Sequence, residues 1–167
     1  VKPGWETYAV EWDASVLDSL NRLQYYHDAQ WEVCDTRNTA RFSAIGFAFG
    51  RMLADSLQVP VGLILNAVGG SPTEAWIDRK TLEFEFPDIL QLWTKNDFIQ
   101  NCVRERAALN IKQASNPLQR HPYEPCYLFE AGIQPLHRYP IKGIIWYQGE
   151  SNAHNMEVHE RLFPLLV

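Results

Sequence analysis

An apolar run near the end of the chain is followed directly by side chains that offer an amide, a carboxylate and a hydroxyl: Gln148, Glu150, Ser151 and Asn152. The run itself, 142–147, is rich in β-branched and aromatic residues, which is typical of a buried strand. Ligands of open α/β folds bind beyond the carboxyl ends of such strands. The pattern therefore predicts a binding or catalytic site where this strand ends.

A second candidate turn follows another apolar run, at Gly69 and Gly70. The run, 61–68, predicts a parallel strand, and the glycines offer backbone N–H groups with no Cβ to block a substrate. Acyl transfer needs such donors, because the carbonyl oxygen becomes negatively charged in the tetrahedral intermediate. Considered alone, the two glycines also fit a tight turn between a strand and a helix.

Ser151 is a candidate nucleophile, because 149–153 approaches the Gly-x-Ser-x-Gly pattern of hydrolase elbows. Ala153 stands where that pattern has its last glycine, the residue that lets strand and helix approach closely. His154 and His159 follow in the sequence, but their five-residue separation does not suit a pair of metal ligands on one helix.

The cysteines show no metal-site pattern. Cys34, Cys102 and Cys126 lie far apart without a Cys-x-x-Cys pair, so we expect no structural zinc and interpret them as buried structural residues. His121 lies in a proline-rich segment and either lines a pocket or is a solvated loop residue.

The two polar turns resemble two blocks of the sialate O-acetylesterase family, carbohydrate esterases among the SGNH hydrolases that remove acetyl esters from sugars. The later block is 144–152, and the earlier block comprises 60–64 and 68–76. Both occur in the order that the family has, and the similarity covers roughly 31–77 and 123–166.

The resemblance implies roles for the polar residues of the two blocks. It assigns the Gly70 N–H and the Gln148 amide to an oxyanion hole, with Asn152 as the alternative donor. It also implies that Glu150 supports the site from behind, by binding donors that hold the serine loop.

Aromatic and hydroxyl side chains beside the motifs are expected to contact the sugar. These substrate-binding candidates are Trp76, Trp146 and Ser71, together with Asn152. Ser71 and Thr73 are also interpreted as helix caps, and Glu74 as a carboxylate in the first turn of a helix rather than a catalyst.

The family places its nucleophilic serine in a Gly-Gln-Ser-Asn block and its base in an Asp-x-x-His pair, and neither pattern occurs here. We therefore expect the chain to be the central part of a larger serine esterase and to be inactive alone. The implied mechanism is serine attack on the acetyl carbonyl followed by hydrolysis, with no metal or organic cofactor.

Composition limits the classes of partner. The chain has 167 residues, of which 46% are hydrophobic, enough for one domain with a sizeable core. Its net charge of -5 and its lack of a Lys/Arg cluster argue against nucleic acid and anionic membranes, and no apolar run is long enough to span a bilayer. We expect one partial esterase domain over 1–167 whose partner is an acetylated carbohydrate, in a secreted or periplasmic parent protein.

Three other functions stay open at this point. An acetylxylan esterase shares these blocks, and a non-catalytic carbohydrate-binding or interaction module would keep the fold without the triad. A nucleotide-binding flavodoxin-like domain is supported only by Gly69 and Gly70, without a longer glycine-rich fingerprint.

The resemblance implies a three-layer α/β/α sandwich with a parallel sheet, of the SGNH or flavodoxin-like type, and incomplete in this chain. Residue patterns predict strands over 31–34, 61–68 and 142–147 and helices over 44–57, 73–82 and 87–115 and from about 155 onward. Ser43 is the expected cap of the first of these helices, the third is expected to break near 95–97, and the prolines of 116–125 predict irregular structure. The first 28 residues are expected to form helix or loop on the surface.

Overall fold

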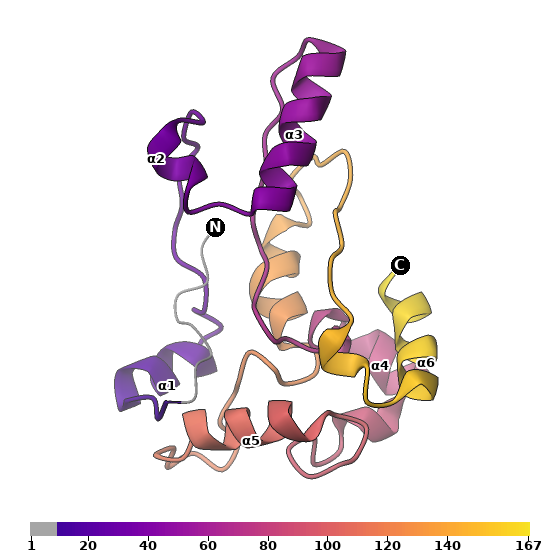
Figure 1. Cartoon of the computed structure of the whole chain (residues 1–167). Coiled ribbons are helices and arrows are strands. Elements are labelled where there is room, and N and C mark those ends of the chain that lie inside the picture. Colours follow the sequence, from indigo (N-terminus) through magenta and orange to yellow (C-terminus); the bar gives the residue numbers. More distant parts are fainter. Residues whose placement is uncertain (1–9) are drawn as a thin grey trace.

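The computed structural model describes residues 10–167, which form helices joined by turns and extended segments (Figure 1). The α-helices of this part are α1 (Ala14–Asn21), α2 (Thr36–Thr39), α3 (Ala44–Leu57), α4 (Arg79–Glu85), α5 (Asn101–Asn110) and α6 (Met156–Leu166). The shorter helical turns are η1 (Thr73–Trp76), η2 (Pro87–Leu90), η3 (Phe129–Ile133), η4 (Gln134–Leu136) and η5 (Glu150–Asn152).

The predicted parallel sheet is wrong for the described residues, because residues 10–167 contain no β-strand. Segments 61–68 and 142–147 run without helix, but no backbone hydrogen bond joins either of them to another described segment as a ladder would. A β-branched run favours an extended chain locally, whereas a sheet also needs a neighbouring strand about 4.8 Å away. The predicted α/β/α sandwich and the strand at 31–34 are corrected for the same reason.

The second run also lacks the predicted burial. Ile144 is 73% exposed and Tyr147 77% exposed, so neither side chain is covered as in the interior of a parallel sheet. Only toward its end does the run enter the protein, at the half-buried Trp146 and Gln148.

Two helices begin where the sequence predicts, and each is capped by a side chain. Ser43 caps α3 by accepting the Gly46 N–H at 3.1 Å, and the predicted bounds 44–57 are confirmed. Asn155 caps α6 by accepting the Val158 N–H at 3.1 Å, which confirms the predicted start of the last helix. In both cases the deciding interaction lies within four residues of the helix start.

The predicted helix over 73–82 is wrong in its bounds. The structure divides this stretch into η1 and α4, and α4 begins after Asp78, whose side chain accepts the Thr81 N–H at 3.0 Å. Ser71 does not cap a helix, because its hydroxyl donates to the carbonyl of Val68 at 2.8 Å. The residue that caps an α-helix in this stretch is Asp78, which was not among the predicted caps.

The predicted helix over 87–115 is also shorter than expected. The structure has η2, a series of turns and then α5, so the interruption extends well beyond 95–97. Leu92 adopts a positive φ of 46°, which a continuous right-handed helix excludes. The irregular structure predicted for 116–125 is confirmed.

The start of the described chain agrees with the expected surface helix or loop. Asp13 caps α1 by accepting the N–H groups of Ser15 and Val16, and Leu17 and Leu20 of this helix are buried. The part of this expectation that concerns residues 1–9 lies outside the described residues.

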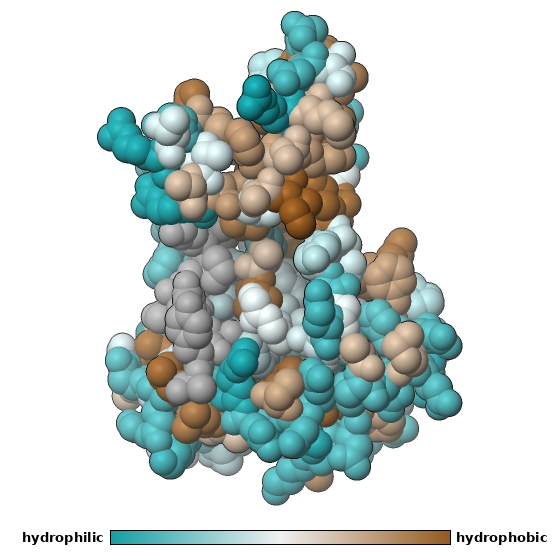
Figure 2. All heavy atoms as spheres, in the orientation of Figure 1, coloured by the Kyte–Doolittle hydropathy of each residue, from teal (hydrophilic) through white to brown (hydrophobic). Residues whose placement is uncertain are grey.

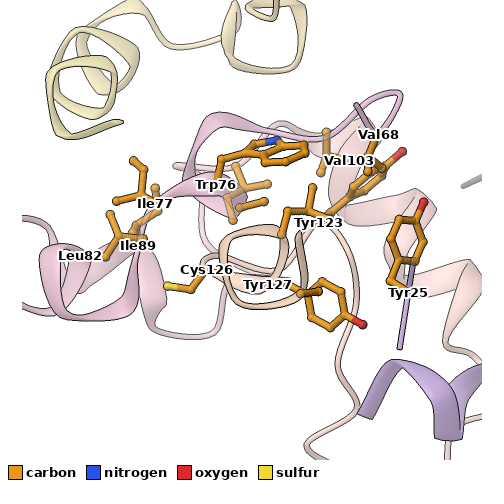
Figure 3. Packing of buried hydrophobic residues seen from close by; sticks show 14 of the residues in the cluster. Tyr25, Val68, Trp76, Ile77, Leu82, Ile89, Val103, Tyr123, Cys126 and Tyr127 are labelled. Carbon is orange, nitrogen blue, oxygen red and sulfur yellow. The ribbon is translucent and has the colours of Figure 1, made fainter. Parts of the chain in front are cut away.

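The apolar core lies where α1, α4, α5 and α6 gather, in the lower part of Figure 1. Its largest fully buried side chains include Tyr25, Tyr123, Tyr127, Phe86, Leu20 and Ile77, several of which are labelled in Figure 3. η1 belongs to this core, because its residues Thr73 to Trp76 are all buried. Closely packed core side chains therefore surround the polar residues of η1.

Helix α3 contributes no side chain to this core; its one buried residue is Gly50. Ile45, Met52 and Leu57 are each more than half exposed. Figure 2 shows the resulting gathering of apolar side chains over the upper part of the molecule.

The cysteine prediction is confirmed for one residue and wrong for two. Cys126 is buried, and burial raises the pKa of its thiol to about 12. Cys34 and Cys102 are exposed, and all three are free thiols. Over 10–167 the structure contains no group of three or more His, Cys, Asp or Glu side chains that could hold a metal ion. No helix in the described part is long and apolar enough to cross a membrane.

Candidate active site

The structure brings the two predicted polar turns together. The Gln148 side-chain amide donates to the carbonyl of Ser71 at 3.2 Å, and the Ser151 hydroxyl donates to the carbonyl of Gly70 at 3.0 Å. The contact is made by a turn and two short helices, η1 and η5, rather than by the edge of a sheet. Residues nearly 80 positions apart thus form one polar cluster.

Asn152 is the centre of this cluster and is 1% exposed. Its Oδ1 accepts the backbone N–H of Thr73 at 2.8 Å and the Gln148 amide at 2.7 Å. Its Nδ2 donates to Oε2 of Glu74 at 2.9 Å. These partners define the orientation of the Asn152 carboxamide, because rotating it by 180° would set oxygen against carboxylate oxygen and N–H against N–H.

Hydrogen bonds also fix the orientation of the Gln148 carboxamide. Its two amide hydrogens point to Oδ1 of Asn152 and to the carbonyl of Ser71, the second at the longer distance. The hydroxyl oxygen of Thr73 lies 2.8 Å from Gln148 Oε1 and 3.0 Å from Asn152 Oδ1, and its single proton serves one of them at a time. Nε2 of Gln148 can therefore reach a further acceptor only by leaving Ser71.

Glu74 is fully buried and was missed as a member of the site. Its Oε1 has no hydrogen-bond partner among the described residues, and its Oε2 is bound by Asn152. Burial raises the pKa of this carboxyl to about 7. Glu74 lies in the first turn of η1, as predicted, but that turn is buried. A usable signal was the apolar stretch Ala75, Trp76 and Ile77 that follows it directly.

We expect the unfolding free energy of the chain to depend on pH because of the buried carboxyl of Glu74. Between pH 4.5 and about 7, Glu74 is protonated in the folded chain and ionised in the unfolded chain. The folded state then binds more protons, so this group's contribution to stability falls as pH rises, by about 3 kcal/mol in all.

We expect the difference in unfolding free energy, wild type minus Glu74→Gln, to fall over this pH range in urea titrations. The difference is the quantity to measure, because buried His121, whose pKa burial lowers to about 3, makes stability rise with pH below 6.5. A difference that is flat from pH 4.5 to 8 would contradict the assignment.

Gly70 has a positive φ of 76°, and a Cβ built there would lie 2.6 Å from the hydroxyl oxygen of Tyr123. This hydroxyl is held in place because it donates to the carbonyl of Gly69 at 2.8 Å. Within 10–167 no hydrogen bond is made by the Gly70 N–H, and the residue is exposed. Position 70 therefore requires a glycine, and its N–H is not used by another described residue. These are the two properties that the predicted oxyanion donor needs.

Among the predicted sugar-binding residues, Trp76 contacts both Trp146 and Ser71 in the structure. Trp76 and Trp146 meet edge to face, with ring centroids 5.9 Å apart and an interplanar angle of 89°. The Trp76 indole N–H donates to the Ser71 hydroxyl at 3.0 Å, and both residues are buried. Trp146 is half-buried, and its indole N–H has no partner among the described residues.

Glu150 lies at the surface in η5. None of the side chains and N–H groups that the structure describes hydrogen-bonds to its carboxylate. The support that the resemblance implies for it is therefore not supplied by the described part of the chain.

Ser151 makes no hydrogen bond to a histidine among the described residues, because its hydroxyl donates to the carbonyl of Gly70 at 3.0 Å. His121 is fully buried, with Nδ1 accepting the Tyr123 N–H at 2.9 Å and Nε2 3.1 Å from Asn110 Oδ1. The interpretation of His121 as a solvated loop residue is wrong.

Comparison with known proteins shows the family of this chain. Residues 11–162 match the family described as SASA, carbohydrate esterase, sialic acid-specific acetylesterase. Sialate O-acetylesterase of Rattus norvegicus is 33% identical over 144 residues, which cover 78% of this chain and 25% of that protein. The Homo sapiens enzyme of the same name is 32% identical over 148 residues, covering 84% of this chain and 24% of the relative.

The chain spans about a quarter of the length of these relatives. No solved structure matches it. The family match covers most of the chain, including both segments of the polar cluster. The chain therefore belongs to the sialic acid-specific acetylesterase family of carbohydrate esterases.

Proposed function

We propose that this chain is part of a longer serine esterase that hydrolyses acetyl esters on sugars, and that it supplies the oxyanion hole. The observation that carries the proposal is the meeting of the two motif segments, in which the Gln148 amide binds the residue next to Gly70. An oxyanion hole needs two donors within reach of one oxygen. We assign the Gly70 N–H and the Gln148 amide to these two positions, because Gln148 binds the residue that follows Gly70.

The proposed step begins when a serine outside this chain attacks the acetyl carbonyl, whose oxygen becomes negatively charged. The unpaired Gly70 N–H donates to that oxygen directly. The Gln148 amide exchanges its 3.2 Å bond to Ser71 for a bond to the oxyanion and keeps the shorter bond to Asn152. A charged acceptor binds an N–H more strongly than a carbonyl does, so the exchange favours the transition state.

The other predicted residues take supporting parts in this proposal. Asn152 is the alternative donor, since only one of its two amide hydrogens binds Glu74. The exposed Glu150 carboxylate is free to bind a loop from the rest of the enzyme. Half-buried Trp146 is the better placed of the two tryptophans to contact a sugar, with Trp76 and Ser71 behind it.

The proposed substrate is an O-acetylated sialic acid, as the names of the relatives indicate, with acetylated xylan as the comparison. The test is release of acetate from each substrate by the longer protein. We expect turnover of O-acetylated sialic acid to exceed that of acetylated xylan. Turnover of neither, by a folded protein, would contradict the proposed function.

We expect the 167-residue chain alone to hydrolyse p-nitrophenyl acetate at the background rate, because a positioned nucleophile and base supply much of the acceleration. Ser151→Ala should not change that rate. Robust hydrolysis by the chain that Ser151→Ala abolishes would identify Ser151 as the nucleophile instead.

A further inference from the structure

The buried carboxylate of Glu74 stands at the end of a chain of hydrogen bonds that leads to Gln148. The Gln148 amide donates to Oδ1 of Asn152 at 2.7 Å, and the amide of Asn152 donates to Oε2 of Glu74 at 2.9 Å. Both distances are in the range of strong hydrogen bonds. Glu74 is therefore linked to Gln148 by hydrogen bonds through the side chain of Asn152.

The carboxylate of Glu74 and the backbone N–H of Thr73 set the direction of the bonds in this chain, from the two ends of the Asn152 carboxamide. An ionised carboxylate only accepts hydrogen bonds, so the amide end of Asn152 must face Glu74. The carbonyl end of Asn152 then faces Gln148 and accepts one of its two amide hydrogens. This leaves the second hydrogen of Gln148 as the one that points to Ser71, at the place of the proposed oxyanion donor.

We propose that Glu74 is a positioning residue that holds the Asn152 carboxamide and, through it, the orientation of the Gln148 amide. The catalytic consequence of this role depends on the proposed function of Gln148 in the oxyanion hole. The orienting role itself concerns the described chain alone. A purely structural carboxylate would stabilise the fold without changing the environment of the Gln148 amide.

No other titratable side chain of the described residues binds the Glu74 carboxyl. Its carboxyl has no recorded ion pair among residues 10–167, and burial, its own backbone and Asn152 account for its shifted pKa. The titratable side chains on α6 and η3, the elements that contact η1, are Glu157, His159, Glu160, Arg161 and Glu130. None of these five hydrogen-bonds to Glu74 within the described structure.

The first test is an NMR titration of the 167-residue chain that follows the side-chain amide signals of Gln148 and Asn152. In the wild type we expect both signals to shift with a midpoint near pH 7, the value at which Glu74 titrates. Glu74→Gln should remove this transition from both signals, whereas the exposed control Glu83→Gln should leave it in place. The comparison also separates an effect of Glu74 from one of His154, because every variant retains His154.

A Gln148 signal that keeps the same transition in Glu74→Gln overturns the inference. If Glu74→Gln does not fold, the wild-type titration still decides, because a Gln148 signal that is flat from pH 5 to 9 also overturns it.

The second test measures acetylated-sugar hydrolysis by the longer esterase carrying Glu74→Gln. We expect kcat to fall about 10-fold with KM nearly unchanged, as for the loss of an orienting partner next to a reacting group. The pH profile of Glu74→Gln should keep the inflection of the histidine base and lose only the part that Glu74 contributes near 7. If the NMR coupling is present while Gln148→Ala leaves kcat unchanged, the oxyanion proposal fails and the positioning inference stands. An unchanged kcat and pH profile in Glu74→Gln, beside an impaired Gln148→Ala, would overturn the catalytic consequence of Glu74.

Discussion

Replacing Gln148 with alanine is expected to lower kcat/KM for an acetylated sugar by about 100-fold in the longer esterase. The amide binds an oxygen that carries charge only in the transition state, so product affinity should stay nearly constant. The measurement is steady-state acetate release, together with equilibrium binding of the deacetylated sugar. A Gln148→Ala enzyme with wild-type kcat/KM would remove Gln148 from the oxyanion hole and favour Asn152 as the donor.

Gln148→Glu is the sharper companion variant and should be more impaired than Gln148→Ala. An ionised carboxylate has no hydrogen to donate and would repel the oxyanion. It would also lie against Oδ1 of Asn152 and the Ser71 carbonyl, which both accept from the native amide. A Glu variant as active as the Ala variant would show that no charge develops beside this position.

The second large effect concerns Gly70. Gly70→Ala should lower the free energy of unfolding by about 2 to 4 kcal/mol, because a positive φ disfavours a Cβ and the added carbon would meet Tyr123. That carbon would lie 2.6 Å from the Tyr123 hydroxyl oxygen and 3.1 Å from Nη1 of Arg106.

Gly69→Ala is the matched control for this variant. Among residues 10–167, a Cβ at Gly69 would have no atom within 4 Å apart from its chain neighbours, and the backbone of Gly69 is outside the left-handed region. We expect Gly69→Ala to change stability by less than about 1 kcal/mol, as measured by urea denaturation of the 167-residue chain. Equal effects of the two substitutions would contradict the strained turn at Gly70.

The parts of the fold that could be predicted are those decided by short-range interactions. The capping side chains of Ser43 and Asn155 bind N–H groups three residues away. The start of α3 was predicted from its cap Ser43, and the start of α6 was predicted at about 155 from the sequence pattern. The parallel sheet could not be settled in this way. Runs 61–68 and 142–147 carry the composition of strands, but pairing depends on neighbours that composition does not reveal.

For the candidate site, the sequence predicted several of its residues but not the hydrogen bonds between them. Resemblance to two family blocks was enough to expect Gly70 and Gln148 near each other, and the structure places Gln148 against the adjoining Ser71. The roles of Thr73 and Glu74 were missed, because both were interpreted by helix position. Their partners lie about 75 residues away, on Gln148 and Asn152.

The most direct test of the shared oxyanion site is the affinity of the longer esterase for methylboronic acid. Attack by a serine makes the boron tetrahedral and negatively charged, which imitates the intermediate of acetyl transfer. We predict that Gln148→Ala weakens inhibition by this compound about 100-fold while binding of the sugar product is unchanged. Equal inhibition of the wild type and Gln148→Ala would contradict the claim that the two segments form one oxyanion site.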